Sequence, residues 1–313
     1  MYKVLITDIS TALLQEGLKN LGFEVVNKPD VDQDYVNRHI HEYEGIIVRS
    51  KITLFEDTLK NAQKLKFIGR PGSGLDLIDL EYCRKKGIAV CRSATSNSNA
   101  VAEHALGMLL AWMNKLVRSD NEVKKMVWRR EANRGFEIMG KTVGIIGFGN
   151  TGSRFAKKMQ GLDVKVLAYD KYKKDYTKEY PHVRESNLAE ICAKADIISF
   201  HLPLNIETKY FLNTDLIEAF SKPVIVINTS RGPIVDTRAL LKGLESGRLR
   251  GACLDVLENE SPSKYIGSEL DMYKSLFAMD KVLLSPHVAG WSANSKIQME
   301  SFLLDEIKEI ANI

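Results

Sequence analysis

The chain has 313 residues, of which 44% are hydrophobic and 27% are charged. This composition is typical of a folded protein with a well-buried core, and the length suits two domains better than one. The formal net charge of +4 at pH 7 argues neither for nor against nucleic acid and would not repel an anionic substrate.

Short β-branched runs alternate with helical patterns along the chain. A first series of predicted strands comprises Lys3–Thr7, Gly45–Val48, Lys66–Gly69 and Ile88–Val90. A second series follows a predicted helix and comprises Thr142–Gly147, Lys165–Tyr169, Asp196–Phe200, Val224–Asn228, Gly251–Asp255 and Val282–Ser285. This alternation predicts parallel sheets, and the two series predict an α/β protein of two doubly wound domains. A (β/α)8 barrel is the alternative, against which the glycine-rich turn described below argues.

Between the two series the pattern predicts one long helix, Ala100–Val117, and then breaks down. Residues 118–140, RSDNEVKKMVWRREANRGFEIMG, are too polar and irregular for a core element and too long for a minimal connection. Two interpretations remain open for this segment: a linker between domains, or an arm that packs on a partner subunit.

The four cysteines bear on metal content and compartment. Cys83, Cys91, Cys192 and Cys253 form no CxxC pair and have no metal-ligand spacing, so we expect no metal site and reduced thiols in a cytoplasmic protein. The N-terminus lacks a signal-peptide pattern, and the apolar stretches fall well below the ~18 residues of a membrane span. We therefore expect neither a membrane nor nucleic acid as a partner.

Residues 142–153, TVGIIGFGNTGS, combine a strand-like run with a glycine-rich turn before a helical pattern. Gly147 allows a tight turn, Gly149 allows close approach to a pyrophosphate, and Gly152 allows the helix to pack on the strand. Asp170 ends the next predicted strand, where its carboxylate can accept both ribose hydroxyls and would repel a 2′-phosphate. The sequence therefore predicts a dinucleotide site with NAD favoured over NADP.

Several further blocks follow in a fixed order, among them HLPL (201–204), INTSRGPIVD (227–236), LDVLENESP (254–262) and SPHVAGW (285–291). With VRS (48–50), IGRPGSGLDLIDL (68–80) and SNSNAVAEHALGMLL (96–110), the chain resembles the D-isomer-specific 2-hydroxyacid dehydrogenases over nearly its whole length. Within that family it is most similar to short D-3-phosphoglycerate dehydrogenases.

The resemblance implies three catalytic residues: Arg231 as the substrate clamp, His287 as the proton carrier and Glu260 as the acid paired with it. A planar guanidinium suits a carboxylate next to a C2 oxygen, and an imidazole suits proton transfer near neutral pH. The family pattern has an acid directly before a proline, whereas Ser261 stands between Glu260 and Pro262 here. Glu258 therefore remains the alternative acid.

The resemblance also implies binding residues in both domains. On the cofactor side they are Gly147, Gly149, Asn150, Thr151, Gly152, Asp170, His201, Leu202, Pro203, Thr229, Ser230, Asp255 and Gly290. Of these, His201, Leu202 and Pro203 are expected to line the adenine side, and Thr229 and Asp255 are expected to approach the nicotinamide amide. On the substrate side they are Arg49, Ser50, Ser73 and Gly74. His104 lies on a helical face, and we expect it to be packed rather than catalytic.

The implied architecture is a Rossmann NAD-binding domain at residues 95–290 and a flavodoxin-like substrate domain at residues 1–94, completed by 291–313. The active site is expected between them, and a homodimer is expected to form through residues 100–140. The implied reaction is NAD-dependent oxidation of a D-2-hydroxy acid, foremost 3-phospho-D-glycerate to 3-phosphohydroxypyruvate at the entry to serine biosynthesis. Two alternatives stay open: reduction of hydroxypyruvate, glyoxylate or another 2-keto acid, and an NAD-sensing, corepressor-like interaction protein.

Overall fold

The computed structural model describes residues 2–93 and 95–310. The chain divides into two compact units, one made of the residues up to Asn97 together with those from Trp291 on, the other of Ser98–Gly290. None of the helices in the described ranges combines the length and the apolar character that a membrane crossing requires.

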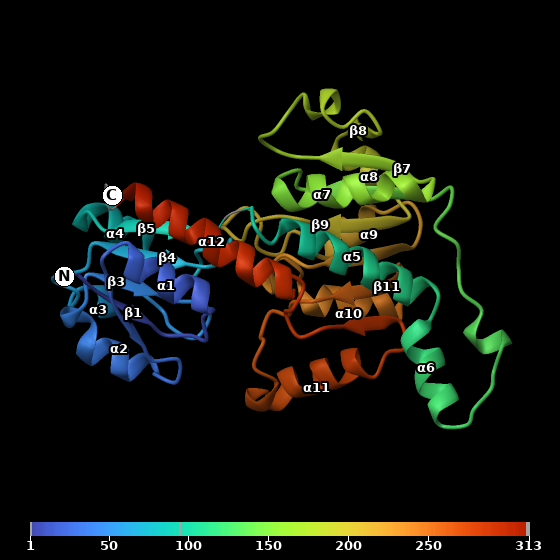
Figure 1. Cartoon of the computed structure of the whole chain (residues 1–313). Helices are drawn as coiled ribbons and strands as arrows, with labels where there is room; N and C mark the ends of the chain where they lie inside the picture. Colours follow the sequence, from blue (N-terminus) through green and yellow to red (C-terminus); the bar gives the residue numbers. More distant parts are fainter. Residues whose placement is uncertain (1, 94, 311–313) are drawn as a thin grey trace. The chain divides into compact units, whose positions relative to one another are not determined.

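The first unit is built on one parallel sheet of five strands in the order β2-β1-β3-β4-β5 (Figure 1). The strands are β1 Lys3–Ile6, β2 Glu24–Asn27, β3 Gly45–Ile47, β4 Phe67–Arg70 and β5 Ala89–Arg92. The helices are α1 Ala12–Asn20, α2 Gln33–His39, α3 Glu56–Leu59, α4 Leu80–Lys86 and α12 Ala293–Ile310, with a 3-10 turn at Ile40–Glu42. This strand order is the flavodoxin-like version of a doubly wound sheet.

Alternate residues of strand β1 enter different cores of this unit. Leu5 belongs to a cluster on one side of the sheet, whereas Val4 and Ile6 belong to a cluster on the other side. Leu303 and Ile307 of α12 join Val4 and Ile6, so the end of the chain completes the core of a unit that begins at the N-terminus.

The second unit contains a parallel sheet of seven strands in the order β12-β11-β10-β9-β6-β7-β8. The strands are β6 Thr142–Ile146, β7 Lys165–Tyr169, β8 Val183–Glu185, β9 Ile197–Phe200, β10 Val224–Asn228, β11 Leu249–Leu254 and β12 Val282–Leu284. The helices are α5 Ser98–Met113, α6 Leu116–Lys124, α7 Asn150–Met159, α8 Leu188–Lys194, α9 Thr214–Ala219, α10 Thr237–Glu245 and α11 Gly267–Phe277. Short 3-10 turns lie at Glu131–Asn133, Gln160–Leu162, Tyr176–Lys178, Gly232–Ile234 and Pro262–Lys264.

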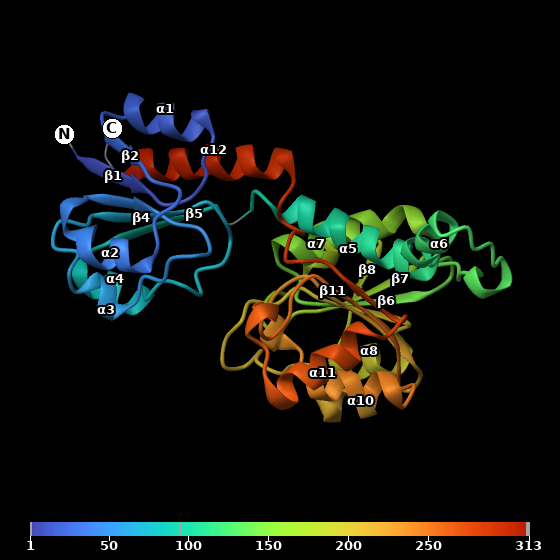
Figure 2. The same cartoon turned by 90° about the horizontal axis from the view of Figure 1, so that it is seen from below.

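Helices cover both faces of the seven-stranded sheet, α5 and α7 on one side and α8, α10 and α11 on the other (Figure 2). From β6 the chain adds β7 and β8 on one side of the sheet and then β9 to β12 on the other, so the order of the strands reverses between the parallel neighbours β6 and β9. Ligands of doubly wound folds bind outside the carboxyl ends of the strands at such a reversal. The prediction of two parallel α/β domains is confirmed.

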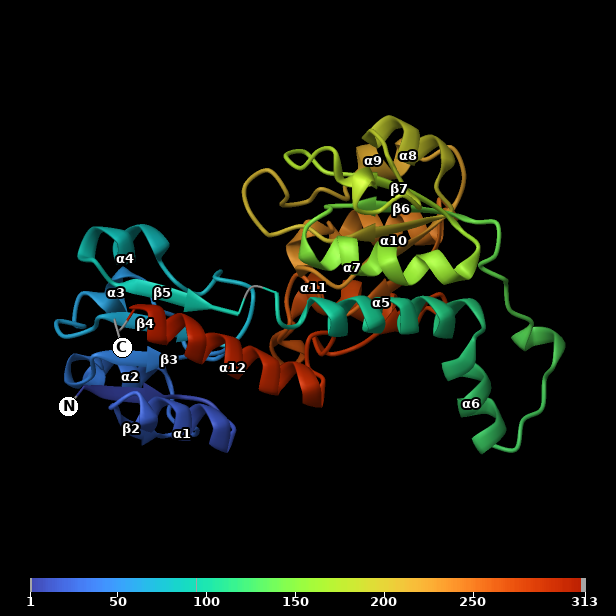
Figure 3. The same cartoon turned by 45° about the horizontal axis from the view of Figure 1, so that its top comes forward.

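The prediction of one helix at Ala100–Val117 is wrong in its C-terminal boundary, because two helices occupy this part of the chain. Helix α5 ends at Met113, Lys115 adopts a left-handed conformation (φ 51°), and α6 starts at Leu116 in a new direction. Helix α6 and the segment after it stand apart from the sheet of their unit (Figure 3). Because this segment leaves and re-enters the same unit, it does not connect the two units, and the linker interpretation of residues 118–140 is wrong.

Candidate active site

Three turns follow β10, β11 and β12 and therefore share one edge of the sheet in the second unit. The turn after β10 is held by Asn228, whose side chain is fully buried. Its amide Nδ2 donates to the carbonyl oxygen of Arg231 (2.9 Å), and its Oδ1 accepts from the amide and hydroxyl of Ser230 (3.1 and 2.7 Å). This buried amide fixes the backbone on which the guanidinium of Arg231 is mounted, and Arg231 Nη1 donates to the Ser230 carbonyl at 2.7 Å.

Gly232 brings the turn after β10 into contact with the loop after β11. A Cβ atom at this position would overlap the backbone of Leu257 and Glu258, so only glycine allows the two segments to lie this close. The residue after Arg231 is thus pressed against the loop that carries Glu260.

The structure pairs His287 with Glu260. The distance from His287 Nδ1 to Glu260 Oε2 is 2.8 Å, and each side chain is nearly half exposed (46% and 44%). Glu258, the alternative acid, is engaged elsewhere: its Oε1 accepts from the backbone N–H of Thr237 (2.6 Å) and its Oε2 from the hydroxyl of Tyr210 (2.9 Å). Of the two glutamates, only Glu260 is positioned to orient the imidazole.

The backbone of His287 has an unusual conformation, with φ at 53°. Left-handed backbone is uncommon for residues other than glycine and costs free energy unless the surroundings enforce it. The His287 N–H donates to the carbonyl oxygens of Asp255 (2.7 Å) and Ser285 (3.1 Å). The carboxylate of Asp255, which is 1% exposed, accepts from the N–H groups of Val288 and Ala289, both at 2.9 Å.

Asp255 was predicted to approach a nicotinamide amide. Its two carboxylate oxygens are instead occupied by the backbone of the 285–289 loop and by the hydroxyl of Ser285 (2.5 Å). In this structure the side chain of Asp255 serves the loop that carries His287.

The glycine-rich turn between β6 and α7 fits a pyrophosphate. Gly147 has φ at 93°, and a Cβ there would collide with the carbonyl of His201, while a Cβ at Gly152 would collide with the carbonyl of Gly147. Gly149, the N-cap of α7, faces open space. The first residues of α7, Asn150 and Thr151, therefore present their backbone N–H groups next to an unobstructed approach.

Asp170 follows β7 and closes the other side of this turn. Its Oδ2 accepts from the N–H of Phe148 (2.7 Å), and its Oδ1 accepts from the N–H groups of Tyr172 and Lys173 (both 2.9 Å). Burial alone would raise the pKa of this carboxyl group, but the hydrogen bonds from Lys173, Phe148 and Tyr172 outweigh it and the pKa is lowered. Asp170 is consequently a fixed negative charge, which suits ribose hydroxyls and opposes a 2′-phosphate.

The three residues expected on the adenine side, His201, Leu202 and Pro203, differ in their burial and in their contacts. The ring of His201 is tucked under α7 at 5.2 Å from the ring of Phe155, and its Nε2 lies 2.9 Å from the hydroxyl of Ser199. Burial lowers the pKa of His201 to about 3, so the ring is neutral. The side chain of Leu202 lies against Gly147, and Pro203 is exposed with its carbonyl bonded to the Thr208 hydroxyl at 2.6 Å.

Thr229 follows β10 beside Ser230. Its hydroxyl is buried and, within the described ranges, has no hydrogen-bond partner. A buried hydroxyl in that state costs free energy unless a ligand or water completes it. This orphaned group, the open glycine turn and the fixed Asp170 together fit NAD. Gly290 lies at the end of the loop that begins at Ser285 and is partly buried.

The substrate residues predicted in the first unit follow β3 and β4. Arg49 comes directly after β3, its N–H donates to Asp8 Oδ2 (3.0 Å), and its guanidinium lies 4.7 Å from the ring of Trp291. Ser50 is exposed and next in the chain. Ser73 and Gly74 follow β4 in a bend and are partly buried.

Sequence reasoning missed Arg70, the last residue of β4. Its Nη1 donates to the carbonyl oxygen of Arg49, so two guanidinium groups belong to neighbouring strand ends of one sheet. The register of β3 and β4, which aligns Ile47 with Gly69, is the signal that could have paired them. Asn228 and Ser285 were also missed: Asn228 bonds to the turn that directly follows it, whereas the bond from Ser285 to Asp255 depends on the fold.

The NAD-binding domain model of the D-isomer specific 2-hydroxyacid dehydrogenases matches residues 106–289. The chain is 31% identical over 309 residues to a D-3-phosphoglycerate dehydrogenase of Archaeoglobus fulgidus, covering 99% of this chain and 57% of that protein. It is also 31% identical over 306 residues to a hydroxypyruvate reductase of Thermotoga maritima, covering 98% and 97%. The chain thus spans little more than half the length of several phosphoglycerate dehydrogenases that it matches.

A D-lactate dehydrogenase of Aquifex aeolicus, solved as a complex with NAD and lactic acid, superposes with a TM-score of 0.85 at 30% identity and covers 99% of this chain and 95% of that one. The prediction of NAD as the cofactor is confirmed by the matched domain. The fold, the cofactor domain and these relatives lead to one conclusion: the chain belongs to the NAD-dependent D-isomer-specific 2-hydroxyacid dehydrogenase family.

Proposed function

We propose that this protein interconverts a D-2-hydroxy acid and the corresponding 2-keto acid, and that His287 carries the proton. The observation that carries the proposal is the 2.8 Å bond between His287 Nδ1 and Glu260 Oε2. A carboxylate on one ring nitrogen fixes the tautomer and leaves the other nitrogen, Nε2, for the substrate.

In the oxidation direction, the O–H bond at C2 breaks and its proton passes to Nε2 of His287. The C2–H bond breaks with both electrons, which leave as hydride, and a C=O bond forms at C2. NAD, when bound, supplies the acceptor for that hydride. Glu260 stabilises the imidazolium that results, and in the reverse direction His287 returns the proton to the C2 oxygen.

Arg231 is assigned to the substrate's carboxylate and C2 oxygen. Its permanently charged planar fork matches two oxygen atoms at once and stabilises negative charge on the C2 oxygen as it develops. Asn228 and Gly232 hold the turn on which this fork is mounted. The backbone N–H groups of Ser73 and Gly74, in the first unit, are assigned to a substrate carboxylate.

The proposed substrate is 3-phospho-D-glycerate, with 3-phosphohydroxypyruvate as product. Arg49 and Arg70 support it, since two guanidinium groups at neighbouring strand ends supply the charge that a phosphate dianion requires. Ser50 lies beside them as a hydroxyl donor. We place this reaction at the entry to serine biosynthesis in the cytoplasm, and four free, buried cysteines suit a reducing compartment.

A substrate panel tests the assignment. With NADH, we expect phosphohydroxypyruvate to be reduced with a kcat/KM at least about 10²-fold above that of hydroxypyruvate, because two charged hydrogen bonds are lost without the phosphate. Arg49→Ala should remove most of this preference and leave hydroxypyruvate turnover in place. Equal rates on the two acids would contradict the phosphorylated substrate, and absence of turnover on every 2-keto acid would favour an NAD-sensing role.

Hydroxypyruvate itself is the second candidate. The relative that the chain covers almost completely, 97% of its length, is a hydroxypyruvate reductase. A higher kcat/KM for the unphosphorylated acid would select this activity, with the same roles for His287, Glu260 and Arg231.

We also propose that the protein is a homodimer through residues 100–140. Helix α6 has no buried residue, and several large apolar side chains on and after it are exposed: Leu116 56%, Val117 50%, Met126 95%, Trp128 77% and Met139 64%. Apolar exposure on this scale marks an interaction surface. We propose that a second copy of the chain covers this exposed apolar surface.

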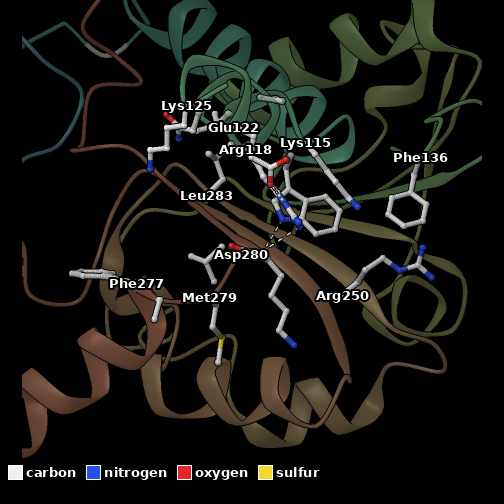
Figure 4. A pocket seen from close by; sticks show the side chains of 17 residues that line it. Lys115, Arg118, Glu122, Lys125, Phe136, Arg250, Phe277, Met279, Asp280 and Leu283 are labelled. Atoms are coloured by element: carbon white, nitrogen blue, oxygen red, sulfur yellow. Dashed lines mark hydrogen bonds and ion pairs between the residues drawn. The ribbon is translucent and has the colours of Figure 1, made fainter. Parts of the chain in front are cut away.

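A groove of the same unit runs under α6 (Figure 4). Its lining includes Trp112, Lys115 and Phe136 beside an ion-pair chain in which Arg118 contacts Glu122 (3.0 Å) and Asp280 (3.3 Å). These ion pairs tie α6 to the segment before β12, while Leu116 and Val123 on the helix stay exposed. We expect a dimer by light scattering, a monomer for the double variant Met126→Glu, Trp128→Glu, and an unchanged dimer for the control Ile266→Glu. A monomeric wild-type protein would contradict the proposal.

A further inference from the structure

A second histidine of the same unit lies behind the loop that carries His287. His104, on α5, has its Nε2 at 2.8 Å from the hydroxyl of Ser285. That hydroxyl lies 2.5 Å from Asp255 Oδ1, and His104 Nε2 is itself 3.6 Å from the same carboxylate oxygen. Residues 181 positions apart in the chain are thereby joined at the junction of α5, β11 and β12.

The direction of these hydrogen bonds follows from donor supply. A carboxylate has no proton to give, so the single proton of the Ser285 hydroxyl is donated to Asp255. The hydroxyl then accepts from Nε2–H of His104. This order differs from a Ser-His-Asp hydrolase, in which the serine donates to the histidine, and it rules out Ser285 as a nucleophile activated by His104.

Asp255 is where this chain of bonds meets the acid–base loop. Its carboxylate accepts from Val288 and Ala289, and its carbonyl accepts from His287 itself. His287 holds a left-handed backbone that its own side chain does not favour. The conformation persists only if Asp255 stays in place, and Ser285 and His104 are the groups that fix its Oδ1 from the side of α5.

We propose that His104 is a positioning residue: through Ser285 and Asp255 it sets the loop geometry that aligns the His287 imidazole with Glu260. The proposal rests on the proposed acid–base role of His287 and adds a residue that touches neither substrate nor cofactor. Removing the Nε2 donor frees the Ser285 hydroxyl to rotate, which weakens one of the bonds that hold Asp255.

The kinetic test compares His104→Leu with His104→Gln. Leucine removes the donor, whereas the glutamine amide places an N–H near the position of Nε2. We expect kcat to fall roughly 10-fold in the leucine variant, since small misplacement of a reacting group costs up to ~10²-fold. The KM of the 2-keto acid and NAD affinity should stay within about twofold, glutamine should restore kcat to within about threefold, and the exposed His41→Leu control should match wild type.

Ser285→Ala breaks the same link from its other end and provides an independent variant if His104→Leu folds poorly. The double variant should lose no more activity than the worse single one, because both changes remove one interaction. Additive losses, or glutamine as inactive as leucine, would overturn the proposal.

A readout without turnover separates this inference from the proposed function. In 15N spectra of labelled histidines, neutral His287 of the wild type should be the Nδ1–H tautomer set by Glu260. His104→Leu should shift it towards a mixture of tautomers, and His104→Gln should not. An unchanged His287 signal in the leucine variant would refute the positioning role, whether or not any 2-keto acid is a substrate.

Discussion

Two strands of the second unit are each followed by an aspartate whose carboxylate accepts hydrogen bonds from backbone N–H groups. Asp170, after β7, accepts three of them and remains partly exposed, whereas Asp255, after β11, accepts two and a hydroxyl and is buried. The first can still receive ligand hydroxyls, and the second can act only on the protein. The same residue type at the same kind of position is therefore partly open to solvent after β7 and enclosed by the loop that it holds after β11.

This contrast separates the effects of substitutions. Changes around Asp170 should alter cofactor affinity and leave kcat in place, whereas changes in the turns after β10, β11 and β12 should alter kcat and leave NAD affinity in place.

His287→Asn should lower kcat by ~10²–10⁴, the range for loss of a general acid–base group. Asparagine tolerates left-handed backbone, so the loop conformation survives the substitution. NAD affinity, measured by fluorescence titration, should be unchanged. If NAD binding collapsed together with turnover, His287 would be a structural residue, and the turn after β12 and the turn after β7 would not act separately.

Glu260→Gln should lower kcat by roughly 10- to 100-fold, because the amide keeps the hydrogen-bonding shape but cannot neutralise the imidazolium. Glu258→Gln is the matched control two residues away. It weakens the contacts to Thr237 and Tyr210, so its effect should appear in thermal stability and leave kcat within about twofold of wild type. A larger kcat loss in Glu258→Gln than in Glu260→Gln would reverse the assignment of the two acids.

Asp170→Asn should raise the dissociation constant of NAD about 10-fold, equivalent to ~1.4 kcal/mol, and should increase the use of NADP relative to NAD. The reason is that the variant removes the fixed negative charge while keeping one acceptor oxygen for the backbone. Saturating NAD should restore the wild-type kcat. Asp215→Asn, on the exposed first turn of α9, is the control, and an unaltered cofactor preference in Asp170→Asn would count against its ribose role.

Substitution of Glu122, on α6, should have the smallest effect, a change in melting temperature that depends on pH. Hydrogen bonds from Arg129, Asn133 and Arg118 lower the pKa of Glu122 from 4.5 to about 2. A carboxyl group whose pKa is lower in the folded than in the unfolded state stabilises the fold at pH values above its unfolded pKa. This stabilisation is lost as the pH falls towards the folded pKa. The melting temperature of wild type should therefore exceed that of Glu122→Gln at pH 7, and the gap should close between pH 4.5 and about 2. A gap that persists at pH 2 would mean that charge on Glu122 is not its cause.

The sequence was sufficient for the architecture because the apolar runs of the central strands and the glycine-rich turn are local signals. Strands β2, EVVN, and β8, VRE, were missed because they are short edge strands with few buried residues. Helix α6 was missed because its sequence, LVRSDNEVK, has only three apolar residues, which is too few to stand out as the apolar pattern of a helix.

The candidate site was less accessible to sequence reasoning. The choice between Glu258 and Glu260 depends on Tyr210 and Thr237, which occupy Glu258 from other parts of the chain. His104 was expected to be packed, and it is partly buried, but its bond to Ser285 spans 181 residues. Arg70 was identified only from its hydrogen bond to the Arg49 carbonyl. The sequence could name the candidate residues, whereas the contacts that distinguish between them had to come from the fold.

The close approach at Gly232 has a consequence for how relatives of this protein can diverge. Any side chain at this position would drive the Arg231 turn and the Glu260 loop apart. Insertions or bulky replacements in either segment are then tolerated only with matching changes in the other, so an engineer who wishes to accommodate a larger 2-keto acid should redesign both segments together.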